Sequence, residues 1–403
     1  EASVREIPIR QMLAEALPEK IEARSNNVID LADAWYANVL AEGLGMEPCP
    51  QSKKDEMLSK IRECRNLDGG YGWFSTMYSS QAVTAALLLR NRKSGGFLSA
   101  EEVGGAVKYL DSAFFGVKSH LIWCGMLSME QYMYVRAMYA EIPFSVNGVN
   151  ADVMKEFRKD AKDYLVPAKE RGLNGRGYAK SRRLLTLRML LHNPGGLELA
   201  KSWGISASTS NRLAKSLRAD IESILQYAVE HKCGGWYYPN LVMPYRGLLD
   251  SELEGHAMMC DLLEESSAPQ IAEGIRLSIM VQKESQHWES DPAYVEALGC
   301  VYRGTEETLS LKVLALSGTT TLPFAELKAS GNGFTVERKY FIGETELKEG
   351  DPVHVGDRIR AEYRIWNEEN RSFVVLRAPR PALLRPVQQL SGYQRGAYRS
   401  VLA

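Results

Sequence analysis

Hydrophobic and polar residues form two kinds of helical segment along most of the chain. The first kind is apolar almost all round and carries little charge, at 79–89, 129–142, 184–191, 248–263 and 294–301. The second kind is more charged and has apolar residues at i, i+3 and i+4 on one face, at 101–115, 151–165, 211–230 and 271–283. This alternation predicts inner helices that are buried on all sides and outer helices with one face in solvent.

Aromatic residues recur with this alternation. Trp73, Trp123, Tyr178, Trp236 and Trp288 are 50, 55, 58 and 52 residues apart, which leaves room for two helices and two connections in each unit. Glycine-rich turns at 68–74 and 233–239 each precede an apolar segment, and we expect their aromatic rings to close the ends of helical hairpins. The pattern predicts an (α/α) toroid of helical hairpins over residues 1–318.

The pattern changes after Gly318. Segments 333–342, 358–366 and 372–377 alternate with period two or are rich in β-branched residues, and Gly-Asp-Pro turns separate them. They predict a small antiparallel β-sandwich over 319–403, and this sandwich is incomplete because too few strands precede Ala403. The expected fold class is therefore mainly α, a toroid followed by a partial β domain.

Composition excludes several function classes. The 403 residues have a formal net charge of −1, so bulk electrostatics gives no reason to expect a nucleic-acid partner. No apolar run of about 18 residues is present, and no membrane-spanning segment is expected. The first residues lack the layout of a signal peptide. Six scattered cysteines, at 49, 64, 124, 233, 260 and 300, are interpreted as buried free thiols.

Several motifs resemble one family. Gly-Phe-Thr-Val-Glu-Arg-Lys-Tyr at 333–340, Leu-Lys-Glu-Gly-Asp-Pro at 347–352, Leu-Ser-Gly-Tyr at 390–393 and the turn at 68–74 are similar to the C-terminal part of bacterial alpha-2-macroglobulins. The resemblance implies that 1–318 is the thioester domain and that 319–403 begins a macroglobulin-type β domain. It also implies a periplasmic or secreted setting, a peptidase as protein partner, and endopeptidase inhibition.

The chain departs from that family at its reactive motif. Active members carry Cys-x-Glu-Gln, whose thiolate and carboxamide form an internal thioester. Residues 36–41 resemble the helix that follows this motif in the family. That resemblance places residues 27–30 where Cys-x-Glu-Gln would lie, with Asn27 at the position of the cysteine and Asp30 at that of the glutamine. The sequence Ser-Met-Glu-Gln at 128–131 begins with Ser and is interpreted as ordinary helix. We therefore expect a non-catalytic interaction protein that has lost the thioester and needs no cofactor.

A carbohydrate-active toroid enzyme, a lyase or glycosidase, is the alternative. Tyr71, Trp73, Trp236 and Tyr237 are candidate cleft or surface residues that could stack on sugar rings, together with Tyr238, and Asp250, Glu252 and Glu254 could supply carboxylates. Recurrence of the aromatic residues in the repeat favours a capping role instead.

Two further patterns have a structural interpretation beside a functional one. His256 and Cys260 share a helix face and could bind zinc with Cys233 or Asp261, although the surrounding apolar run favours a packed histidine and no metal. Residues 199–217 resemble a DNA-binding helix-turn-helix, but they are read more simply as one helix that ends at Gly204 and another capped by Ser206 or Ser208.

Overall fold

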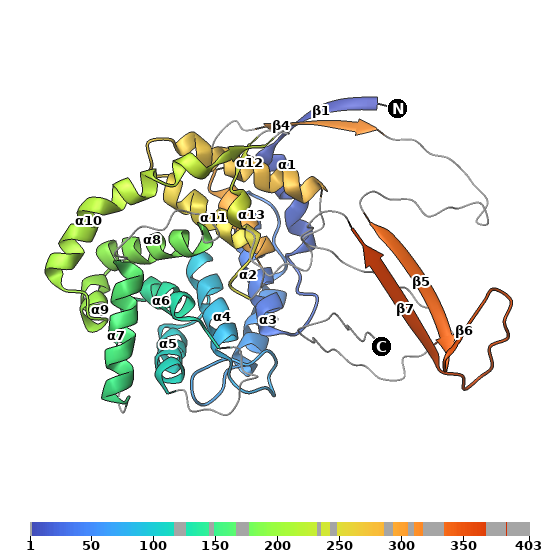
Figure 1. The fold of residues 1–403 in the computed structure, drawn as a ribbon, viewed down its shortest axis with the longest axis horizontal. Helices are drawn as coiled ribbons and strands as arrows, with labels where there is room; N and C mark the ends of the chain where they lie inside the picture. Colours follow the sequence, from blue (N-terminus) through green and yellow to red (C-terminus); the bar gives the residue numbers. More distant parts are fainter. Residues whose placement is uncertain are drawn as a thin grey trace. The chain divides into compact units, whose positions relative to one another are not determined.

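The computed structural model describes residues 2–116, 126–144, 149–166, 177–231, 235–241, 248–285, 293–304, 310–316, 334–367 and 384. The chain divides into two compact units, Glu1–Ser317 and Gly318–Ala403. The first is built from helices and the second contains an antiparallel sheet (Figure 1). The expected mainly α fold is confirmed. Within the described part, no helix is both long and apolar enough to cross a bilayer.

Within the described residues of the first unit, six inner helices form a closed ring (Figure 1). In ring order they are α2 (Val28–Gly43), α4 (Gln81–Lys93), α6 (Met129–Met138), α8 (Gly177–His192), α11 (Glu252–Leu263) and α13 (Tyr294–Tyr302). Each packs on the next, and α13 packs on α2. This closure confirms the toroid that the repeat predicted.

The other helices cover this ring. They are α1 (Ile9–Ala16), α3 (Gln51–Glu63), α5 (Ala100–Phe115), α7 (Ala151–Leu165), α9 (Gly196–Ser202), α10 (Ala207–Glu222) and α12 (Pro269–Ser285). Short 3-10 turns lie at Leu17–Glu19, Leu225–Tyr227 and Pro239–Leu241. Helix α3 packs on α2, α5 on α4, α10 on α8 and α12 on α11. The outer helices α5, α7, α10 and α12 bury the apolar stripes that the sequence pattern marks, as α10 does with Leu213, Leu217 and Ile221.

Helix α4 shows why an inner position requires its sequence. Ser80 caps its start, and residues 83–89 are buried throughout. Small and leucine side chains let neighbouring helices approach on every side. The helix continues beyond the apolar run, however, and Arg90 and Asn91 are buried as well. Charge in the inner ring is therefore greater than the sequence pattern suggested.

Two small strand pairs of the first unit were not predicted. Strand β1 (Ala2–Pro8) pairs antiparallel with β4 (Ser310–Leu316), with Ala2 opposite Leu316. Strand β2 (Val229–Glu230) pairs with β3 (Trp236–Tyr237). The first pair joins segments from the two ends of the unit, and the second is only two residues long. Local sequence patterns therefore provide little signal for either.

The second unit contains a three-stranded antiparallel sheet in the order β6-β5-β7. Its strands are β5 (Thr335–Ile342), β6 (Thr345–Glu346) and β7 (Ile359–Trp366), with Thr335 opposite Trp366. Strands β5 and β7 confirm the predictions at 333–342 and 358–366. The predicted strand at 372–377, and with it a second sheet, lies outside the described residues.

Candidate protein-interaction site

The start of α2 occupies the position at which the family resemblance places the thioester. Asn27 is the N-cap of this helix, and its Oδ1 accepts hydrogen bonds from the backbone N–H groups of Ile29 at 3.1 Å and Asp30 at 2.8 Å. Its amide nitrogen donates to Ser25 Oγ at 2.6 Å. Asp30 lies in the first turn, where its negative charge is favourable near the helix N-terminus. Both side chains thus have roles in starting a helix.

A structured loop at residues 66–79 joins α3 to α4 and contacts this helix start. The Trp73 carbonyl accepts a hydrogen bond from the Val28 N–H at 3.0 Å. Asp68 Oδ1 accepts from the Gly70 N–H at 2.9 Å and from the Ser79 hydroxyl at 2.7 Å, which closes the loop on itself. Gly69 has a φ of +87°, and a Cβ there would lie 2.6 Å from the Gly105 carbonyl oxygen. The loop conformation is therefore fixed by its own hydrogen bonds and by close packing on α5.

This loop presents large apolar side chains to solvent. Tyr78 is 80% exposed and Trp73 is 38% exposed. The exposed large apolar residues of the loop are Leu67, Trp73, Phe74, Met77 and Tyr78, which we call the loop patch. Exposed apolar side chains that gather on one rigid segment are typical of an interaction surface. The candidate site is thus the loop patch together with the start of α2.

The expectation that Trp73 is a buried plug is wrong. Tyr71 is the inward residue of this turn: it is fully buried, and its N–H donates to Thr84 Oγ1 of α4 at 2.9 Å. The loop backbone places Tyr71 on the helices and turns Trp73 outward. Burial raises the pKa of the Tyr71 hydroxyl well above its usual value, so this group stays neutral.

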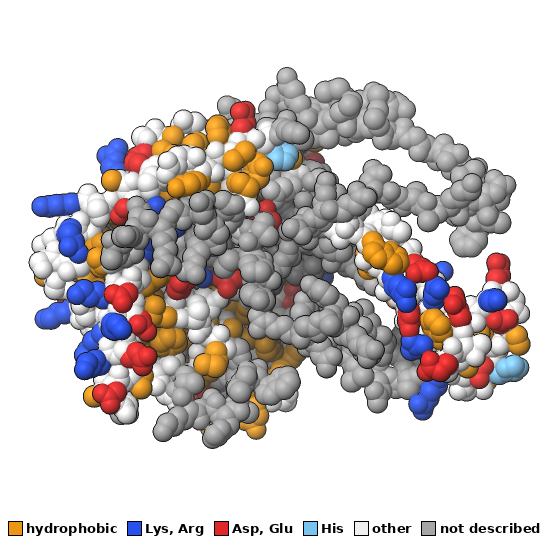
Figure 2. Space-filling view, viewed as in Figure 1, with side chains coloured by type: hydrophobic (Ala, Val, Ile, Leu, Met, Phe, Trp, Pro, Cys, Tyr) orange, Lys and Arg blue, Asp and Glu red, His pale blue; other side chains and the backbone are white. Residues whose placement is uncertain are grey.

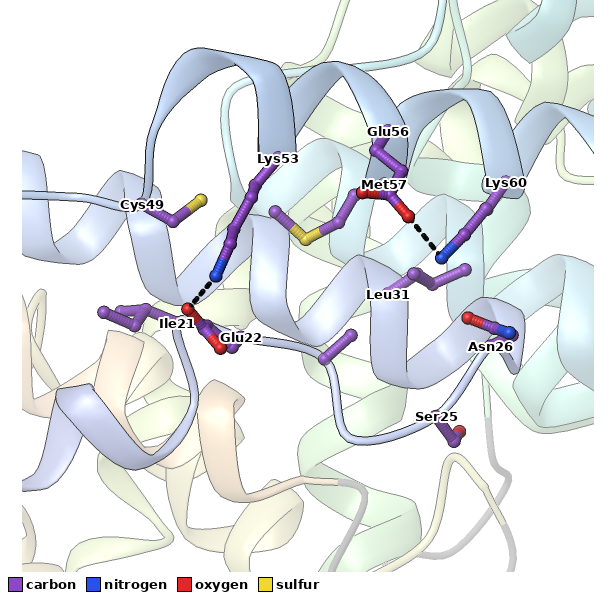
Figure 3. Close-up of a pocket in the computed structure, with 11 residues that line it drawn as sticks. Ile21, Glu22, Ser25, Asn26, Leu31, Cys49, Lys53, Glu56, Met57 and Lys60 are labelled. Atoms are coloured by element: carbon purple, nitrogen blue, oxygen red, sulfur yellow. Dashed lines mark hydrogen bonds and ion pairs between the residues drawn. The ribbon is translucent and has the colours of Figure 1, made fainter.

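A cavity of about 170 Å³ lies beside the start of α2, between the 21–26 segment and α3 (Figure 3). Leu31 and Met57 supply apolar walls. At its rim Lys53 pairs with Glu22, and Lys60 pairs with Glu56 at 2.6 Å. Because these charges neutralise one another, the cavity carries no strong electrostatic preference for a ligand.

Cys49 is the thiol of this cavity. Burial raises its pKa, which disfavours the thiolate. Since the thiolate is the nucleophilic form, the local environment does not activate this cysteine. Cys49, Cys64, Cys260 and Cys300 are buried free thiols, as expected, whereas Cys124 and Cys233 lie outside the described residues.

The sequence Ser-Met-Glu-Gln at 128–131 forms a capping box at the start of α6. Ser128 Oγ accepts from the Gln131 N–H at 3.2 Å, and Gln131 Oε1 accepts from the Ser128 N–H at 2.8 Å. This reciprocal pair satisfies two backbone donors that would otherwise lack a partner. The segment is ordinary helix, as the sequence analysis interpreted it.

His256 and Cys260 have structural hydrogen-bond partners. His256 Nε2 accepts the Tyr238 N–H at 3.1 Å, while Nδ1 lies 2.9 Å from the Glu252 carbonyl and donates to it. Burial lowers the pKa of His256, so the ring is neutral. Cys260 Sγ donates to the Ala272 carbonyl at 3.4 Å. The described residues contain no group of three side chains suited to a metal ion.

The candidate sugar-binding residues are not brought together as one cleft. Trp236 and Tyr237 are half-buried on β3, which packs on α12, with Trp236 against Gly274. Tyr71 and Trp73 instead belong to the loop between α3 and α4. Asp250 bonds to Arg182 at 2.6 Å and to Gln131 at 2.6 Å. Glu254 of α11 is buried, with Lys93 at 3.7 Å, so Asp250 and Glu254 both have structural partners.

Residues 196–222 fold as two outer helices. Helix α9 ends at Ser202, Gly204 follows with a φ of +85°, and Ser206 caps α10. This arrangement agrees with the simpler interpretation of the segment that resembles a helix-turn-helix. Trp203, which sequence reasoning did not single out, is fully buried at the end of α9.

A buried charge cluster was also missed. Arg90 of α4 contacts Asp33 of α2 at 2.8 Å and Glu296 of α13 at 3.2 Å, and Lys93 contacts Glu296 at 2.6 Å. Burial raises the pKa of Asp33 to about 6, and Arg90 partly offsets this effect. The four residues come from three inner helices, and their partners become visible only once the ring is closed. The available sequence signals were the charges just beyond the apolar run 79–89 and Glu296 within the apolar run 294–301.

Comparison with known proteins gives one domain match. Residues 333–401 match the model of the bacterial alpha-2-macroglobulin MG10 domain, and this range contains the motifs at 333–340, 347–352 and 390–393. No curated protein matches the chain.

Solved bacterial alpha-2-macroglobulins are among the similar structures. One is the native Escherichia coli protein from domain MG7 to the C-terminus, with 12% identity, a TM-score of 0.44, and coverage of 91% of this chain and 63% of that one. Another is the Salmonella protein reacted with methylamine, with 12% identity, a TM-score of 0.45, and coverage of 91% and 24%. The chain thus spans less than two thirds of the length of either. The match at residues 333–401 confirms the resemblance to the bacterial alpha-2-macroglobulin family that the sequence motifs predicted.

Proposed function

We propose that this chain is a non-catalytic protein-interaction module of an alpha-2-macroglobulin-like protein. In this proposal residues 1–318 are the thioester-domain toroid without its thioester, and 319–403 begin the macroglobulin-type β domain. The setting is the periplasm or the cell exterior, and the partner is a peptidase that is trapped without a covalent bond. The single observation that carries the interaction role is the loop patch, because it holds five large apolar side chains on a rigid loop.

The energetics favour binding at this loop. Its hydrogen bonds fix the backbone before a partner arrives, so little ordering entropy is lost on association. Trp and Tyr are the residue types that most often dominate binding energy at protein interfaces. Trp73 and Tyr78 are therefore the side chains that we expect to contribute most.

A binding measurement with matched variants tests this role. Porcine elastase, which activates the Escherichia coli protein, serves as the probe after its active-site serine has been blocked. We expect the chain to bind it, and a Trp73→Ser/Phe74→Ser/Tyr78→Ser variant to bind at least about tenfold more weakly, a loss of roughly 1.4 kcal/mol or more. Leu197 of α9, which is also exposed, provides the control Leu197→Ser, and it should bind normally. No binding by the wild-type chain, or equal loss in both variants, would contradict the proposal.

Loss of the thioester has a separate chemical test. Methylamine cleaves an internal thioester, adds its own mass and frees a thiol. Since Asn27 and Asp30 stand at the positions of the reactive pair, the intact mass should not change after methylamine treatment. A gain equal to one methylamine adduct would sink this part of the proposal.

A further inference from the structure

The exposed face of α10 carries positive charge without acidic neighbours along most of its length. Arg212, Lys215 and Arg218 are all exposed, and residues 207–219 contain no Asp or Glu. Steps of three residues place Arg212 and Arg218 about 60° to either side of Lys215 on the helix surface. The three cations thus form one broad strip about 9 Å long, since each residue rises about 1.5 Å. We call it the α10 strip.

Neighbouring α7 provides a contrast. Its cations are exposed but alternate with four exposed carboxylates; the cations are Lys155, Arg158, Lys159 and Lys162, and the carboxylates are Asp152, Glu156, Asp160 and Asp163. Figure 2 shows Lys and Arg side chains along the edge occupied by α10 in Figure 1, and mixed charges over the region of α7. The charge on α10 is therefore separated from acidic groups, while that on α7 is locally balanced.

The α10 strip is weakly neutralised from within the protein. In the parts of the chain that the structure describes, neither Arg212 nor Lys215 has a carboxylate within ion-pair distance, and Arg218 reaches Glu222 only at 4.0 Å. The other exposed residues of α10 are short, namely Ala207, Ser208, Asn211, Ala214 and Ala219. A partner backbone can consequently approach the helix closely.

We propose that the α10 strip binds an acidic helical segment of a protein partner. Carboxylates at i, i+3 and i+7 on such a helix are about 4.5 and 6 Å apart along its axis, close to the steps of about 4.5 Å between Arg212, Lys215 and Arg218. The arginines can each form two parallel hydrogen bonds with a carboxylate, which adds geometric specificity to the charge attraction. Charge complementarity of this kind increases the association rate and selects the partner.

Two other anionic partners fit less well. A nucleic-acid duplex needs a wide basic surface, and the carboxylates of α7 would repel its phosphates. Single strands need exposed aromatic rings for base stacking, and the exposed face of α10 has none. An anionic membrane surface usually binds helices that also insert large apolar side chains, whereas here the apolar residues on this face are alanines.

The α10 strip is distinct from the loop patch. Helix α10 packs on α8, which is the fourth helix of the ring counted from α2, whereas the loop patch lies beside α2. The two surfaces thus lie on opposite sides of the toroid. Binding at one can be tested while the other is intact, and the inference does not depend on the proposed peptidase contact.

Fluorescence anisotropy with a labelled helical peptide provides the test. The peptide carries glutamates at i, i+3, i+4 and i+7 on one face and is titrated with the full chain. We expect an Arg212→Gln/Lys215→Gln/Arg218→Gln variant to bind about tenfold more weakly or worse, because each charge pair at a surface contributes about 0.2–1 kcal/mol. Wild-type binding should also weaken as salt is raised to about 0.5 M, since salt screens exposed charges.

The α7 variant Lys155→Gln/Lys159→Gln/Lys162→Gln removes the same charge and should bind the peptide as the wild type does. Equal loss in both triple variants would mean that bulk charge, not the α10 strip, is responsible, and would overturn the proposal. The proposal would also be overturned if the chain bound a DNA duplex or anionic phospholipid vesicles more tightly than the peptide and the α10 variant lost that binding. If the α10 triple variant does not fold by circular dichroism, the single change Lys215→Glu replaces it with the same criteria.

Discussion

Among the described residues, Trp203 is the one fully buried tryptophan. It is fully buried, with its ring centroid 6.1 Å from that of Phe157 and 6.4 Å from that of Tyr132. Trp203→Ala should lower the free energy of unfolding by about 3–5 kcal/mol because it leaves a large cavity. Trp73→Ala removes an exposed ring and should cost about 1 kcal/mol or less. Urea unfolding measures both, and equal losses would restore the buried-plug interpretation of Trp73.

Trp203→Phe provides the matched control. Among the described residues, the indole N–H of Trp203 has no hydrogen-bond partner. Phenylalanine keeps part of the packing and removes this buried donor, so it should cost clearly less than alanine. A cost as large as that of Trp203→Ala would show that the indole makes a contact that is essential in itself.

Asp33 should make stability depend on pH. Its pKa in the folded protein is about 6, above the ordinary value of 3.8, because burial outweighs the attraction of Arg90. The folded state therefore binds the proton more tightly than the unfolded state. The stability gained from the protonated group is complete below about pH 4 and is lost as the pH rises through 6.

The change Asp33→Asn removes this titration. The free energy of unfolding of the wild type, relative to Asp33→Asn, should fall by about 1–3 kcal/mol between pH 4 and pH 6.5, since one pKa unit corresponds to about 1.4 kcal/mol. Denaturant unfolding at a series of pH values measures the difference. Curves that stay parallel would show that Asp33 does not titrate in this range.

At the scale of the element, Asn27 should stabilise α2 as a helix cap. Asn27→Ala loses the hydrogen bonds to the Ile29 and Asp30 N–H groups and should cost about 0.5–2 kcal/mol. Asn27→Asp keeps an acceptor oxygen and adds a charge that the helix N-terminus favours, so it should retain most of the stability. Thermal unfolding of both variants checks this role, and an unchanged midpoint in Asn27→Ala would refute it.

At the scale of the whole molecule, the two units should differ in local stability. The described residues of β5, β6 and β7 include none that is buried, whereas α4 and α11 are buried along most of their length. Amide hydrogens of β5 and β7 should therefore exchange faster than those around Leu87 or Leu262. Hydrogen-exchange mass spectrometry compares the two. Uniform protection would indicate that the sheet is fully covered and that the sandwich is complete.

Sequence periodicity by itself predicted most of the inner and outer helices, because a buried helix needs apolar residues on all sides and a surface helix on one. Helices α1, α2 and α3 were not among the periodic segments. It also predicted β5 and β7, whose alternation has period two, and the cap of α10, for which Ser206 was one of two candidates. The resemblance to the family could be recognised from the sequence because each of its motifs is a run of consecutive residues.

Contacts that form only when the ring of helices closes could be seen only in the tertiary structure. Arg90, Asp33 and Glu296 are far apart in sequence, and their pairing follows from the contacts that α2 makes with α4 and α13. The outward turn of Trp73 beside the inward Tyr71 follows from hydrogen bonds within one loop, which no periodicity encodes. The pairing of β1 with β4 likewise needed the two ends of the unit to meet. Local patterns specify which faces are apolar, but the partners of charged and loop residues are set by long-range packing.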